Sequence, residues 1–208
     1  MNNLFANKRK NTLAICFTSI YTLFLILTFN FNAAYFSLNF RYALNSLFID
    51  LTSLITPVLV LIFLLTLKKD YRFKKWLFPI AFGVTFARSL VSLISSFNTL
   101  KYAITTPLYL VIYLCSWLML ITLALMFVGT LFEFKYLNLL KYGALGYIVL
   151  SFTVQVIEFI NVGGIAYFQN IPQGIAPINF VALIKLVAQL LFYIGIFILT
   201  LKNKNTAK

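Results

Sequence analysis

The chain has 208 residues, of which 62% are hydrophobic and 10% are charged, whereas a soluble domain has roughly 45–50% and 25%. So few polar side chains could not cover the surface of a folded domain in water, which excludes an ordinary soluble protein. Histidine is absent, and Cys16 and Cys115 lie far apart in apolar segments, so the sequence predicts no metal centre, no cofactor and no disulfide framework.

The formal net charge is +13. Nucleic-acid binding would require basic side chains gathered on one face of a soluble fold. Here they lie in short breaks between apolar segments, as the residues that set the orientation of membrane helices do. The sequence therefore predicts the lipid bilayer as a partner, and no nucleic acid.

The whole chain, residues 1–208, is predicted to form a single membrane domain, because long apolar segments follow one another along it. A membrane-spanning helix needs about 20 mainly apolar residues. Pro57 lies inside the second segment and predicts a kink there, with Thr56 beside it to bind a freed backbone group. The fold class is therefore an all-α integral membrane protein, a bundle of six transmembrane helices over approximately 12–29, 44–67, 76–97, 104–130, 142–161 and 177–201.

Lysine and arginine between the spans indicate the orientation, because short loops rich in these residues stay in the cytoplasm. One side of the membrane would hold only Arg41 and Lys101. Both termini are therefore predicted to be cytoplasmic, with 1–11 and 202–208 as short basic ends. The other side would hold Lys8, Arg9, Lys10, Lys68, Lys69, Arg72, Lys74, Lys75, Lys135, Lys141, Lys202, Lys204 and Lys208.

Four charged residues, Asp50, Arg88, Glu158 and Lys185, fall inside predicted spans. Each costs about 2.5–3.5 kcal/mol at the centre of a membrane helix, so none is expected to face lipid. Their depths from the outer ends of their spans are roughly 9, 14, 5 and 12 Å at 1.5 Å per residue. All four belong to the outer half, which favours a polar vestibule open to the outside.

Each intramembrane charge belongs to a polar stripe with steps of three and four residues, the spacing of one helix face. Four such faces, on spans two, three, five and six, are predicted to turn toward one another. Arg88 is predicted to pair with Asp50, and Lys185 to lie near Glu158. The predicted ligand-binding or ion-pair cluster is Asp50, Arg88, Glu158, Lys185, Gln155, Gln189, Ser92 and Tyr193.

Two readings of this cluster remain open. The cluster could bind or transport a polar small molecule or ion. Alternatively, its side chains could only hold the helices together, in a non-catalytic accessory or immunity-type subunit of a larger membrane complex. An intramembrane enzyme is a third class. The chain is not expected to be an enzyme, because no nucleophile with a neighbouring base and no phosphate-binding loop accompanies the carboxylates. Frequent Asn, Lys, Ile and Phe beside scarce Gly and Ala suggest an A+T-rich bacterial genome. The predicted location is therefore the plasma membrane of a bacterium.

Overall fold

The computed structural model describes residues 7–28, 40–66, 74–95, 107–132, 136–161 and 176–201, and only the backbone at 40–47, 49–50, 74, 95, 108, 158–161 and 176–182. These residues form helices throughout, with short turns at their ends and no β-strand. The helices are α1 (Lys8–Thr28), α3 (Phe40–Leu65), α4 (Lys74–Ser95), α6 (Pro107–Leu131), α7 (Leu137–Asn161) and α9 (Ala176–Thr200).

Each helix covers one of the six apolar segments, but several begin before the apolar residues do. α7 begins at Leu137 and includes Lys141, although the sequence predicted a start near 142. Lysine marks the limit of the hydrocarbon core without ending a helix, since it is a good helix former. Residues outside an apolar segment can therefore extend a helix, as they do at the start of α7.

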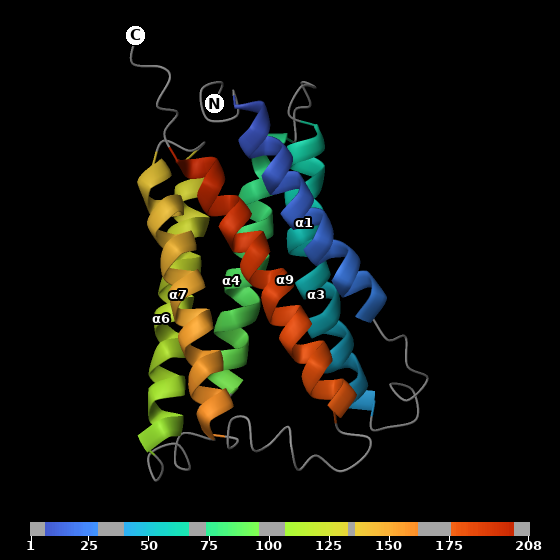
Figure 1. Ribbon diagram of the computed structural model, residues 1–208, viewed down its shortest axis with the longest axis vertical. Helices are drawn as coiled ribbons and strands as arrows, with labels where there is room; N and C mark the ends of the chain where they lie inside the picture. Colours follow the sequence, from blue (N-terminus) through green and yellow to red (C-terminus); the bar gives the residue numbers. More distant parts are fainter. Residues whose placement is uncertain are drawn as a thin grey trace.

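The six helices form a closed ring in chain order. Each helix packs against the next, and α9 packs back against α1. Residues 8 and 201 consequently lie at the same end of the bundle, where Lys10 Nζ donates a hydrogen bond to the Leu201 carbonyl oxygen at 2.6 Å. We call this the terminal end, and the opposite one, where α1 ends and α9 begins, the distal end (Figure 1).

Glycine allows α6 and α7 to approach closely. A Cβ atom on Gly143 would lie 2.8 Å from the backbone oxygen of Thr122, and one on Gly129 would lie 2.7 Å from the backbone nitrogen of Leu140. Backbone atoms cannot move aside as a flexible side chain can. Small residues at such contacts are a common way for membrane helices to associate, because apolar side chains gain little from leaving lipid.

α3 continues through Pro57, and Thr56 beside it connects α3 to α4. The hydroxyls of Thr56 and Thr85 lie 2.6 Å apart, and they approach the carbonyl oxygen of Ala81 at 3.1 and 3.0 Å. Thr56 was expected to bind a backbone group freed by Pro57. The structure shows it bonded to the neighbouring helix instead.

The terminal half of the ring is filled by large apolar side chains. Phe63 and Phe78 meet edge to face with ring centroids 4.5 Å apart, and Phe78 lies 5.8 Å from Phe82. These rings belong to a tightly packed core. The residues that fill it, each at most 2% exposed, are Phe63, Phe78, Phe82, Met126, Leu140, Ile196 and Leu199.

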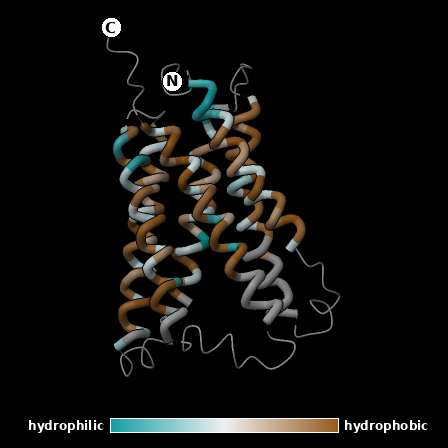
Figure 2. Tube along the Cα trace, in the orientation of Figure 1, coloured by the Kyte–Doolittle hydropathy of each residue, from teal (hydrophilic) through white to brown (hydrophobic). Residues whose placement is uncertain are grey.

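The outer surface of the bundle is apolar, with exposed side chains such as Leu27, Leu23 and Phe152 (Figure 2). Five helices are long and apolar enough to cross a membrane, namely those at Lys8–Thr28, Lys75–Ile94, Tyr109–Leu131, Leu137–Ile157 and Leu183–Thr200. α3 contributes a shorter apolar segment, Leu51–Leu65. An apolar exterior of this extent needs lipid around it, as in a multi-pass membrane protein.

Candidate functional site

A cavity of about 490 Å³ lies inside the ring, and all six helices contribute to it. We call it the central cavity. Its volume is within the usual range of ligand sites, roughly 300–1,000 Å³. It is lined by Tyr21, Phe48, Ser53, Arg88, Ser89, Val91, Ser92, Leu93, Ser116, Met119, Leu120, Leu123, Tyr147, Lys185 and Gln189.

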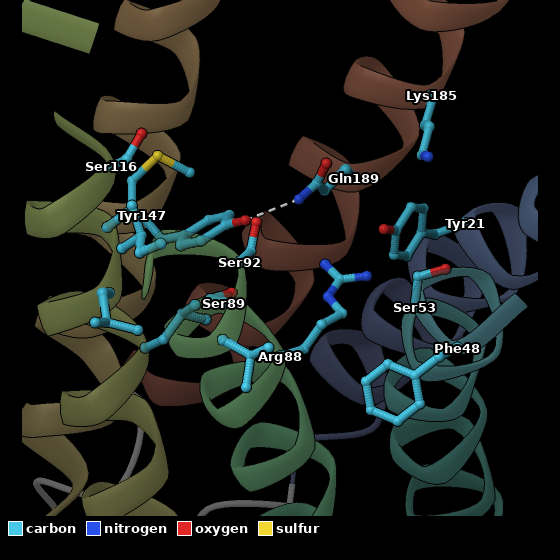
Figure 3. Close-up of a pocket in the computed structure, with 15 residues that line it drawn as sticks. Tyr21, Phe48, Ser53, Arg88, Ser89, Ser92, Ser116, Tyr147, Lys185 and Gln189 are labelled. Carbon is cyan, nitrogen blue, oxygen red and sulfur yellow. Dashed lines mark hydrogen bonds between the residues drawn. The ribbon is translucent and has the colours of Figure 1, made fainter. Parts of the chain in front are cut away.

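Two cationic side chains enter the central cavity from helices that lie opposite each other in the ring. Arg88 comes from α4 and is partly buried, and Lys185 comes from α9. The charged end of each side chain points toward the space beside Tyr21 and Gln189 (Figure 3). Two converging cations with flexible stems can hold an anionic group between them.

A hydrogen-bonded wall faces these cations. Gln189 Nε2 donates to the hydroxyl oxygen of Tyr147 at 2.9 Å. The ring of Tyr147 lies 4.1 Å from that of Tyr193, which is 3% exposed. Arg88 interacts electrostatically with Tyr21, Tyr147 and Tyr193. Packing therefore holds Tyr147 and Tyr193 in place on one side of the space that Arg88 enters.

Apolar side chains close the cavity toward the terminal end. Leu120 and Leu123 on α6 belong to its lining, and Leu123 is only 1% exposed. One turn beyond them the packed core begins at Met126, which is fully buried. The polar cavity and the packed core thus divide the bundle into a hollow distal part and a filled terminal part.

A second cavity of about 360 Å³ adjoins the first between α7 and α9. We call it the α7–α9 seam. It shares Met119, Tyr147, Lys185 and Gln189 with the central cavity. The remaining lining residues of the seam are Ser151, Val154, Gln155 and Leu186.

The structure brings most of the predicted cluster together. Arg88, Ser92, Lys185 and Gln189 line the central cavity, and Gln155 lines the adjoining α7–α9 seam. Tyr193 does not line either cavity but packs behind Tyr147. Its predicted position on a polar stripe is therefore close to the site without being part of the surface.

Asp50 and Glu158 lie in α3 and α7, but their side chains are outside the described residues. The predicted pairing of Arg88 with Asp50, and of Lys185 with Glu158, therefore stays a prediction. Asp50 lies three residues before Ser53, which lines the central cavity, and Glu158 lies three residues after Gln155. This spacing puts each acid on the same helix face as a lining residue.

Sequence reasoning missed Tyr21 and Ser116, which bring α1 and α6 into the site. The predicted cluster involved only spans two, three, five and six. Tyr21 follows Thr18 by three residues, a spacing that could have revealed a short polar face on span one. Ser116 likewise follows Tyr113 by three residues, so the same spacing could have indicated a short polar face on span four.

Cations, hydroxyls and an amide converge on one space, and among the described residues no group of three or more Cys, Asp or Glu side chains could hold a metal ion. No protein-family model, curated protein or solved structure matches the chain.

Proposed function

We propose that this chain is a six-span membrane protein, with both termini in the cytoplasm, that binds or transports a polar small molecule or ion. The central cavity supports the proposal, because every helix of the ring supplies part of its lining. Ligand sites in helical bundles commonly lie between the helices, as this cavity does. We assign it no catalytic step.

The proposed orientation comes from the distribution of lysine and arginine in the sequence, and it decides which side of the membrane the cavity faces. With cytoplasmic termini, the hollow distal part of the bundle faces the outside and the packed core of Phe63, Phe78 and Phe82 faces the cytoplasm. A ligand would then reach Arg88 and Lys185 from outside, with the packed core barring its further passage. We propose the plasma membrane of a bacterium as the location.

The expected result of a ligand screen is a selective rise in thermal stability. A solute at about 100 times its Kd stabilises the folded state by about 2.7 kcal/mol. Purified protein would be unfolded by heat with amino acids, organic acids, sugars, nucleosides and inorganic ions added separately. We expect at least one solute class to raise the unfolding temperature of the parent but not of Ser92→Leu, whose larger side chain fills the cavity.

The matched control is Thr153→Leu. Thr153 is exposed, and its hydroxyl donates to the Val149 carbonyl oxygen of its own helix at 2.9 Å, so this variant is expected to respond like the parent. If no solute acted on the parent and a larger membrane protein co-purified in equal amount, the chain would be an accessory subunit instead.

A further inference from the structure

The α7–α9 seam continues the polar interior of the bundle into an opening between these two helices. Near the terminal end the two helices are in contact through Tyr147, which bonds to Gln189 at 2.9 Å and packs on Tyr193 at 4.1 Å. Toward the distal end α7 and α9 diverge (Figure 1). The space between them there is the seam itself, lined from both helices.

Polar side chains extend from the central cavity into this opening. Ser151 and Gln155 on α7 follow Tyr147 at steps of four residues, and Lys185 on α9 precedes Gln189 by four. This spacing keeps each set on one helix face. A polar strip therefore continues from the central cavity along α7 and α9 toward the distal end.

Apolar side chains close in sequence to the seam residues are exposed. Phe152 on α7 is 58% exposed, and Leu183 on α9 is 51% exposed. In a bilayer such side chains would contact acyl chains. A polar groove between two lipid-facing apolar surfaces matches a molecule with a polar head and an apolar tail.

Within the described part of the lining, the charged side chains are the cations Lys185 and Arg88. Lys185 lines both cavities, and Arg88 lies further inside. Gln189, Ser92 and the Tyr147 hydroxyl add donors around them. Arginine and lysine together with hydroxyl donors suit a phosphate or carboxylate group.

We propose that the ligand is an anionic amphiphile of the bilayer, which enters sideways between α7 and α9. Its phosphate or carboxylate group binds Lys185 and Arg88, and its acyl chains stay in the membrane beside Phe152 and Leu183. This inference rests on the proposed function, for which it names the ligand class. With cytoplasmic termini, the ligand comes from the outer leaflet.

A lipid titration of the purified protein in detergent micelles tests the inference, with the rise in unfolding temperature as the readout. The probes are phosphatidylglycerol, neutral phosphatidylcholine and soluble glycerol phosphate, which has the anionic group without the tails. We expect saturable stabilisation by phosphatidylglycerol, and none by phosphatidylcholine. Glycerol phosphate should bind at least tenfold more weakly than phosphatidylglycerol.

Two variants test the contribution of the charge and the contribution of the seam separately. Lys185→Gln removes a cation from the site, and Val154→Trp fills the seam while leaving both cations. Each should weaken phosphatidylglycerol binding at least tenfold. The matched controls should bind like the parent: Lys141→Gln removes a basic residue near the terminal end, and Val149→Trp enlarges a 55% exposed residue on the same helix.

The remaining outcomes overturn the inference in distinguishable ways. If glycerol phosphate binds as tightly as the lipid, or Val154→Trp binds the lipid like the parent, the ligand does not enter sideways, and the proposed function stands. If Lys185→Gln binds phosphatidylglycerol like the parent, the lipid binds elsewhere. If neither these probes nor the solute classes above stabilise the parent, both the inference and the proposed function are wrong.

Discussion

Replacing Arg88 by leucine is expected to lower the free energy of unfolding by about 3–5 kcal/mol, the usual cost of removing one partner of a buried ion pair. Arg88 is partly buried and lines the central cavity together with Tyr21 and Tyr147, and the sequence predicts Asp50 as its partner. The measurement is thermal or denaturant unfolding in detergent micelles. Arg9→Leu is the matched control, because Arg9 is exposed in the first turn of α1, and it should leave stability unchanged.

A double variant tests the partner of Arg88. If Asp50 is that partner, Arg88→Leu with Asp50→Leu should be more stable than either single variant, because no buried charge is left uncompensated. Additive losses would show that Arg88 is stabilised by the surrounding hydroxyls and not by Asp50. Equal stability of Arg88→Leu and Arg9→Leu would contradict the placement of Arg88 in a protein interior.

Replacing Phe78 by alanine is expected to cost a similar amount, about 3–5 kcal/mol, as for other large side chains removed from a packed core. Phe78 is 1% exposed and packs between Phe63 and Phe82. The control is Ile80→Ala on the same helix, where the side chain is 49% exposed and its loss should cost about 0.5 kcal/mol or less. Unfolding of both variants in the same detergent makes the comparison. Similar losses would show that the terminal half is loosely packed.

Polar residues of the site could be predicted where they recur along a helix at a spacing of three or four residues. Arg88 and Ser92 lie four residues apart, as do Lys185 and Gln189, and this repetition is enough to indicate a shared helix face. Ser116 was missed although Tyr113 lies three residues before it, on the same helix face. Its place in the cavity depends on how α6 packs.

The arrangement of helices could not be predicted, since apolar faces do not identify their neighbours. The closeness of α6 and α7 depends on Gly143 meeting the backbone of Thr122, a fit between residues of two different helices. The ring order follows from several such contacts together. The α7–α9 seam could not be predicted either, because it depends on how two helices diverge and not on any one residue.

The proposed function requires that a polar cavity in the distal part of the bundle is open to water from outside the cell. The direct measurement is cysteine labelling in a background in which Cys16 and Cys115 are replaced. A charged thiol reagent that does not cross membranes would be added to intact cells carrying Ser92→Cys, in the cavity, or Ala81→Cys, which lies in the packed part of the same helix at 0% exposure. We predict rapid labelling at position 92 and none at position 81. Labelling of Ser92→Cys only after the membrane is permeabilised, or equal labelling at both positions, would contradict the account.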